Sequence, residues 1–204
     1  MRMKANTTPS LFIIESLTFR DEERKRFEGS ILSDILALSG KNDVKYFYIR
    51  TEKELKAALK KFAYSEYRYL HISCHGDRAG IGLTLDSMSF EEFAQDVKPY
   101  IQKRRLFFSA CEVMREEFAE ALLPNSECYS VIGPQSSISF GDAALMWASF
   151  YHLVFRDKNH KDGLKGGKIR WALRRICHTF GQQFDYYKPS KAAKGYERVN
   201  IEKR

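Results

Sequence analysis

The alternation of strand-like and helix-like segments most constrains how this chain can fold. Short apolar runs, typical of buried strands, are separated by segments whose apolar residues recur at helical spacing. The strand-like runs are Ser10–Leu17, Val44–Arg50, Tyr67–Cys74, Arg105–Ala110 and Tyr129–Gly133. Because parallel strands need long crossover connections, this order predicts an α/β fold with a mostly parallel central sheet and helices on both faces.

The helix-like segments have recognisable ends. Two of them begin with a capping box, in which a Ser or Thr precedes a Glu by three residues, at Thr51 and at Ser89. The pattern predicts helices over residues 21–39, 51–64, 89–102, 114–123, 141–155 and 164–180. The first of these is expected to be one continuous helix closed by Gly40. Residues 81–85 are expected to add a short strand or hairpin arm.

Length and charge bound the organisation of the chain. A chain of 204 residues with 44% hydrophobic content can bury one core, expected over residues 1–187. Residues 156–204 carry 14 basic and 5 acidic side chains, against 20 and 21 in residues 1–155. The basic segment 188–204 is predicted to be a polar tail or an edge segment. A basic block attracts nucleic acid, an acidic partner or anionic lipid, but most commonly it is a solvated surface.

The N-terminal residues and the cysteines indicate a cytoplasmic protein. The first nine residues are polar, and no stretch of the sequence is apolar for long enough to cross a bilayer, so we expect no membrane contact. The four cysteines have no regular spacing, which favours free thiols in a reducing compartment over a disulfide framework. They are Cys74, Cys111, Cys128 and Cys177.

Two strand-like runs end on reactive side chains. Residues 70–76 read LHISCHG and end on His75 and Gly76, and residues 106–111 read LFFSAC and end on Cys111. If the two strands are neighbours in a parallel sheet, His75 and Cys111 meet at its carboxyl edge, where open α/β folds place their chemistry. An imidazole beside a thiol is a base beside a nucleophile, and the N-terminus of a helix following Cys111 would also favour the thiolate. Gly76 lacks a Cβ atom, so its N–H can approach a substrate carbonyl.

The order of these motifs resembles that of the caspase-like cysteine peptidases, and within them the bacterial CHAT-type branch. The resemblance covers roughly residues 10–155 and includes a Gly-containing loop and a helix starting near Asp142. It implies a three-layer caspase-like sandwich and peptide-bond hydrolysis through a thioester, without a cofactor. In that reaction His75 would be base and acid, Cys111 the nucleophile, and the N–H groups of Gly76 and Cys111 the oxyanion donors. It also implies an effector of a bacterial defence system or of regulated proteolysis, controlled by a partner protein.

The sequence indicates substrate specificity less clearly than it indicates the catalytic residues. The loop from Pro134 to Gly141 should border the cleft, and the candidates for substrate contacts are Glu112, Gln135, Ser136 and Asp142. Acidic side chains at the pocket would favour a Lys or Arg before the scissile bond. For Asp142, however, we favour a role in capping the helix that follows. A third catalytic member is not identifiable, because Asp77 or a backbone carbonyl could orient His75 equally well.

Other interpretations stay open. A His-Gly pair at a strand end is often a turn, and a cysteine ending a buried strand is often a core residue. The chain could then be an inactive caspase-like module that docks a partner through its basic C-terminal region, or a nucleic-acid-binding α/β domain using that region. A zinc site of Cys74, His75 and Cys111 lacks the usual ligand spacing, so we expect no metal. Cys74 and His71 are expected to be buried structural residues.

Overall fold

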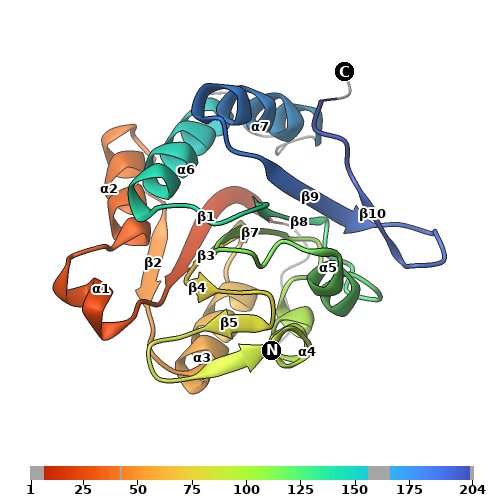
Figure 1. Cartoon of the computed structure of the whole chain (residues 1–204), viewed down its shortest axis with the longest axis horizontal. Helices are drawn as coiled ribbons and strands as arrows, with labels where there is room; N and C mark the ends of the chain where they lie inside the picture. Colours follow the sequence, from red (N-terminus) through yellow and green to blue (C-terminus); the bar gives the residue numbers. More distant parts are fainter. Residues whose placement is uncertain (1–6, 42, 156–165, 203–204) are drawn as a thin grey trace.

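A seven-stranded, mostly parallel sheet forms the centre of the molecule (Figure 1). The computed structural model describes residues 7–41, 43–155 and 166–202. The sheet order is β10-β9-β8-β7-β3-β1-β2, and neighbouring strands from β8 to β2 are parallel. The strands are β1 (Thr8–Glu15), β2 (Lys45–Tyr48), β3 (Tyr67–Ser73), β7 (Arg105–Ser109), β8 (Ser130–Pro134), β9 (Phe184–Pro189) and β10 (Tyr196–Arg198). The five strands predicted from the sequence are all present.

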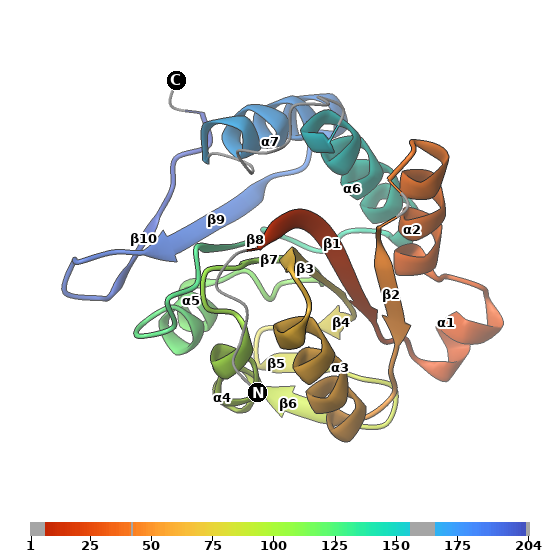
Figure 2. The same ribbon diagram turned by 180° about the vertical axis from the view of Figure 1, so that it is seen from behind.

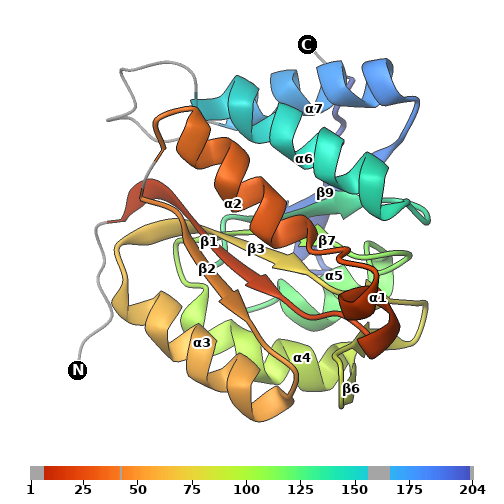
Figure 3. The ribbon, with the colours of Figure 1, turned by 90° about the vertical axis from the view of Figure 1, so that its left-hand side faces the viewer.

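Helices cover both faces of this sheet, which makes the three-layer sandwich that was expected (Figure 3). One face carries α2 (Glu28–Leu38), α6 (Phe140–Phe155) and α7 (Gly166–Phe180). The other carries α3 (Glu52–Tyr64), α4 (Phe90–Val97), extended by a 3-10 turn (Lys98–Tyr100), and α5 (Glu116–Leu122). The short helix α1 (Phe19–Glu23) follows the carboxyl end of β1. Both predicted capping boxes form, at Thr51 and at Ser89.

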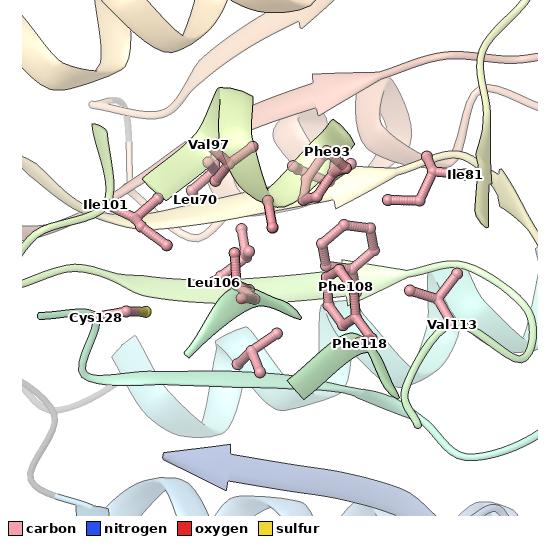
Figure 4. Packing of buried hydrophobic residues seen from close by; sticks show 14 of the residues in the cluster. Leu70, Ile81, Phe93, Val97, Ile101, Leu106, Phe108, Val113, Phe118 and Cys128 are labelled. Atoms are coloured by element: carbon pink, nitrogen blue, oxygen red, sulfur yellow. The ribbon is translucent and has the colours of Figure 1, made fainter. Parts of the chain in front are cut away.

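Two apolar layers, one on each side of the sheet, make the core. In β7, Leu106 and Phe108 face the layer under α3, α4 and α5, where Phe93 and Phe118 pack against Phe108 (Figure 4). Phe107 points to the opposite layer, under α2, α6 and α7. This alternation follows from the two-residue period of a strand. It also places Ser109 on the α2 side, where its hydroxyl donates to Glu28.

A second, three-stranded antiparallel sheet follows β3. It contains β4 (His75–Gly76), β5 (Gly80–Gly82) and β6 (Ser87–Ser89) in that order. The turn between β4 and β5 is held by the Asp77 carboxylate, which accepts hydrogen bonds from the N–H groups of Ala79 and Gly80. This sheet is the hairpin arm expected near residues 81–85, and it fixes the backbone of His75.

The C-terminal segment is an edge of the main sheet and not a free tail. Strand β9 pairs antiparallel with β8, and β10 pairs antiparallel with β9. Tyr196 and Ile201 are buried, which ties this segment to the core. Figure 2 shows β9 and β10 beyond β8, so they cover an edge that would otherwise expose unpaired backbone groups.

The helix predicted over residues 21–39 is wrong as a single element. It is divided into α1 and α2, because Lys25 has a left-handed backbone with φ of 56°. The Thr18 side chain accepts a hydrogen bond from the N–H of Asp21 and caps α1. The division places Asp21 in α1, beyond the carboxyl end of β1, and starts α2 at Glu28. Both acidic residues thereby reach the carboxyl edge of the sheet.

In the part of the chain that the structure describes, the longest helix is α6, with 16 residues. No described helix combines the length and the apolar character needed to cross a bilayer. The four cysteines are free thiols, and Cys128 and Cys177 are buried, as expected for core residues.

Candidate active site

His75 and Cys111 lie at one cavity, as the sequence predicted. Strands β3 and β7 are parallel neighbours in a register that pairs Ser73 with Ser109. His75 and Cys111 each follow two residues later, so the register brings both to the same level of the sheet edge. Both side chains line a narrow cavity of about 40 Å³. The imidazole is 42% exposed, so solvent reaches it.

Asp21 is the residue that orients His75, and the sequence analysis missed it. The Nε2 atom of His75 lies 2.8 Å from the Oδ2 atom of Asp21. An ionised carboxylate only accepts hydrogen bonds, so Nε2 must carry the proton in this contact. The other ring nitrogen, Nδ1, is then free to act on a thiol. Asp77, which the sequence offered for this role, is instead engaged in its own turn.

The electrostatics of Asp21 keep it ionised. Burial acts to raise the pKa of Asp21, but hydrogen bonds from Thr18, His75 and Arg26 outweigh it and lower the pKa below its ordinary value. The Arg26 Nη1 atom is 3.0 Å from Oδ1 of the same carboxylate. Each oxygen of Asp21 therefore has a partner, and the carboxylate is fixed toward the imidazole.

Phe140, the first residue of α6, packs against the imidazole of His75. Its ring meets the His75 ring edge to face, with centroids 5.6 Å apart. The Arg26 guanidinium lies over the same phenyl ring at 5.3 Å. Such contacts restrict the rotamer of His75 at a partly exposed position. Neither Phe140 nor Arg26 carries a local sequence signal for this role.

Cys111 is engaged by the loop between β8 and α6. Its Sγ atom donates to the carbonyl oxygen of Ile138 at 3.6 Å. The loop is held in turn by the segment after α7, since the N–H of Gln135 donates to the carbonyl of Gln183 and the Gln182 amide donates to Ser136 Oγ. The expectation that residues 134–141 border the cleft is met through Ile138 and Phe140. Gln135 and Ser136 are exposed and do not line the cavity.

Gly76 packs directly against the backbone of Cys111. A Cβ atom at Gly76 would lie 2.3 Å from Cγ2 of Val113 and 3.1 Å from the carbonyl oxygen of Cys111. Any larger residue would push the two strand ends apart. Gly76 is therefore needed for the close packing of the two strand ends, while the approach of its N–H to a substrate carbonyl stays a prediction.

Two predicted acidic contacts have other roles. The Glu112 carboxylate pairs with the Arg78 guanidinium, at 3.0 Å, and does not line the cavity. The cap of α6 is Ser139, whose Oγ accepts a hydrogen bond from the Asp142 N–H and donates to the Asp142 carboxylate at 2.7 Å. Asp142, which was favoured as the capping residue, is instead the third residue of the helix and holds the Ser139 hydroxyl.

A different acid, Glu28, lines the cavity. It belongs to the first turn of α2, and its Oε2 atom accepts hydrogen bonds from Ser73 Oγ at 3.0 Å and from Ser109 Oγ at 2.8 Å. These two serines come two residues before His75 and Cys111. The sequence gave no sign of this contact, because Glu28 was assigned to the middle of a longer helix.

No helix begins directly after Cys111, contrary to what the sequence predicted. The helix α5 starts at Glu116, after Glu112 adopts a left-handed φ of 54°, so no helix N-terminus adjoins the thiol. Cys74 packs against the layer under α3, α4 and α5, as expected, but it is only half-buried and also lines the cavity beside His75 and Cys111. Burial raises the pKa of its thiol above the ordinary range. Among the described residues, no group of three or more His, Cys, Asp or Glu side chains could hold a metal ion.

Comparison with known proteins supports the same fold. No protein-family model and no curated protein sequence matches the chain. Two solved structures of a secreted C11 cysteine protease from Bacteroides thetaiotaomicron match with TM-scores of 0.60 and 0.61 at 11% and 9% identity, the second in complex with an irreversible peptide inhibitor. The matches cover 90% and 89% of this chain, and 67% and 66% of the protease chains.

The Arg-specific cysteine proteinase gingipain R, from Porphyromonas gingivalis, matches with a TM-score of 0.54 at 12% identity. The match covers 87% of this chain and 45% of the proteinase chain. The chain has the fold of these cysteine proteases. It spans about half of gingipain R and about two thirds of the C11 protease.

Proposed function

We propose that this chain is a cysteine endopeptidase of the caspase-like fold, with His75 and Cys111 as its catalytic dyad. The observation that carries the proposal is their placement at one cavity on the carboxyl edge of neighbouring parallel strands. A shared fold with cysteine proteases adds support, and the sequence motifs favour the CHAT-type branch. The free thiols agree with action in the cytoplasm, where they stay reduced.

The reaction has two halves. The Cys111 thiolate attacks the carbonyl carbon of a peptide bond, and backbone N–H groups at Gly76 and Cys111 stabilise the oxyanion. Protonated His75 donates its proton to the leaving nitrogen, so the C–N bond breaks and a thioester stays on Cys111. In the second half, His75 removes a proton from water, which attacks the thioester. The acid product leaves, and the thiol is restored.

Asp21 completes this mechanism as a positioning residue. Because its carboxylate accepts the Nε2 proton, His75 exchanges protons with thiol, leaving group and water through Nδ1. A fixed carboxylate also stabilises the imidazolium that forms when the thiol is deprotonated. Asp21 would thus have the role that the acid has in catalytic triads.

We further propose that a partner protein controls the activity by moving the loop that holds Cys111. The cavity is narrow, and the thiol is engaged by the Ile138 carbonyl. Gln182 and Gln183, which hold the loop, directly follow the basic helix α7. A partner bound at that end could release the loop without touching the dyad, as a defence or regulated-proteolysis system would require.

Labelling of the thiol tests the proposal even if turnover needs a partner. We expect iodoacetamide to modify Cys111 first, and replacement of His75 by Ala to slow that modification at least about tenfold. Cleavage of a protein substrate should be abolished by Cys111→Ala and kept by Cys128→Ala, the matched change at a buried thiol. Equal labelling of all four cysteines, or cleavage by the Cys111→Ala protein, would contradict the proposal.

The second candidate is a module that docks a partner through α7. Its basis is a groove of about 630 Å³ beside α7, whose lining includes Trp171, Arg174, Arg175 and His178. The Arg175 guanidinium stacks over the Trp171 ring at 4.7 Å. This groove suits an acidic protein segment, and nucleic acid is the alternative ligand. Binding of single-stranded nucleic acid that weakens steeply with salt, and that the double change of Arg174 and Arg175 to Ala abolishes, would favour nucleic acid.

A further inference from the structure

A single oxygen atom joins the two strands that lead to His75 and Cys111. Ser73 of β3 and Ser109 of β7 are partners in the register of the sheet, and both hydroxyls donate to Oε2 of Glu28, at 3.0 Å and 2.8 Å. All three residues are buried. His75 and Cys111 follow the two serines by two residues each. The link therefore lies just inside the sheet edge that carries the two reactive side chains.

The two strands separate directly beyond this link. The N–H of Cys74 donates to the Ser109 carbonyl at 3.1 Å, so backbone pairing reaches the level of the serines. One residue later, His75 pairs with Gly82 of the second sheet, and Cys111 lies in a turn. The distance between the two reactive side chains therefore depends on what fixes the ends of β3 and β7.

Strand β1 holds Glu28 in place. Glu28 is the first residue of α2, and the next residue, Gly29, donates its N–H to Oε1 of Glu15 at 2.7 Å. A Cβ atom at Gly29 would lie 2.9 Å from Cγ2 of Ile13, so the first turn of α2 packs tightly on β1. Because β1 is the sheet neighbour of β3, the Glu28 carboxyl group is a fixed point for both strand ends.

Stability alone does not account for this polar group. The Oε1 atom of Glu28 has no hydrogen-bond partner among the described residues, and the equally unpartnered Nε2 atom of His71 lies 3.6 Å from it, beyond hydrogen-bond distance. An incompletely paired buried carboxylate costs free energy, and apolar residues of similar volume often stabilise a core at least as well. The distinct effect of Glu28 is that one atom fixes two donors on two strands.

We propose that Glu28 is a positioning residue, which acts through Ser73 and Ser109 to hold the Cys111 sulfur and the His75 ring at reacting distance. The inference rests on the proposed function, since it takes His75 and Cys111 as the dyad. A base acts only within hydrogen-bond reach of the proton that it removes, and a misplacement of about 1 Å can cost about 100-fold in rate. This role needs no contact between Glu28 and the substrate.

The rate of Cys111 alkylation by iodoacetamide measures the role without a substrate. The double change of Ser73 and Ser109 to Ala should slow alkylation about fivefold, because the imidazole then assists the thiol less well. Glu28→Gln, whose amide oxygen can still accept from both hydroxyls, should slow it less than about twofold. In a His75→Ala background the double serine change should have no further effect, since no imidazole is left to position.

Two further proteins separate positioning from stability. The combined change Glu28→Met, Ser73→Ala and Ser109→Ala removes the polar group at similar volume, so its melting temperature should be no lower than that of the wild type. Its alkylation should still be about fivefold slower. The matched control is Ser130→Ala, at a buried serine of β8 that does not line the cavity, and it should leave the alkylation rate unchanged.

The results that would overturn the positioning role are distinct from those that would overturn the proposed function. The positioning role fails if the serine changes leave alkylation unchanged, if their effect persists in the His75→Ala background, or if the triple variant loses melting temperature together with reactivity. The single change Ser109→Ala gives the same comparison should the double variant fail to fold. If His75→Ala itself does not slow alkylation of Cys111, the proposed function fails and this inference fails with it.

Discussion

Glu15 should make the stability of the fold depend on pH near neutrality. Its carboxyl is fully buried at the end of β1 and accepts hydrogen bonds from the Gly29 N–H and the Tyr46 hydroxyl, both at 2.7 Å. Burial, and less strongly the nearby carboxylate of Glu28, raise its pKa from 4.5 to about 7 against the opposing effect of these two hydrogen bonds. The folded chain therefore holds a proton that the unfolded chain has already lost.

The sign and size of the effect follow from linkage. Between pH 4.5 and 7 the folded state binds more protons than the unfolded state, so the free energy of unfolding falls as the pH rises through this window. The stabilising contribution of the Glu15 proton is fully present below pH 4.5 and is lost above about pH 7. A pKa raised from 4.5 to about 7 corresponds to roughly 3 kcal/mol. That is a large part of the stability of an ordinary domain.

Replacing Glu15 by Gln removes the titration and keeps the shape. The amide can accept from the Gly29 N–H and donate to the Tyr46 hydroxyl, so we expect little change at pH 5. At pH 8 the Glu15→Gln protein should be more stable than the wild type by up to roughly 3 kcal/mol. Urea unfolding followed by circular dichroism at pH 5, 6, 7 and 8 measures this difference. The control is Glu23→Gln, at an exposed glutamate of α1. If Glu15→Gln and wild type give parallel curves across this range, the assignment of the buried proton to Glu15 is refuted.

Three further changes test the site and its support. Gly76→Ala should destabilise the protein by about 1–3 kcal/mol in thermal unfolding, because its Cβ would meet Val113, and the added change Val113→Ala should recover part of that loss. Asp21→Asn should lower kcat/KM on the order of 100-fold and change its pH profile, and it should also lower the melting temperature, because the lowered pKa of Asp21 means that its ionised form stabilises the fold; a normal pH profile would show that His75 needs no acid. Arg104→Met should cost about 3 kcal/mol in urea unfolding by leaving three backbone carbonyls unpaired, without altering alkylation of Cys111.

Most of the framework could be predicted from local patterns. Three kinds of feature depend mainly on neighbouring residues and can therefore be predicted from the sequence. They are the strand runs, the capping boxes at Thr51 and Ser89, and the order of strands and crossover helices. Placing His75 beside Cys111 needed only one assumption, that two strands joined by a helix are neighbours. The register between Ser73 and Ser109 bears this out.

The contacts that surround the dyad could not be predicted in the same way. Asp21 and His75 are 54 residues apart, and Glu28 reaches Ser109 across 81 residues. Neither acid has a local signature, and a left-handed residue, Lys25, decides that α1 and α2 are separate. Glu112, which is next to Cys111 in sequence, turns away to Arg78, because the backbone reverses there.

By itself, the sequence determined the layers of this protein and the two reactive side chains at the edge of its sheet, because apolar periodicity and strand ends are local properties of the chain. Only the tertiary structure decided which acids face those side chains and which loop engages the thiol. The physical reason is that burial and hydrogen-bond partners are set where distant segments meet. The same carboxyl group is a solvated surface charge or a buried hydrogen-bond acceptor according to what packs around it.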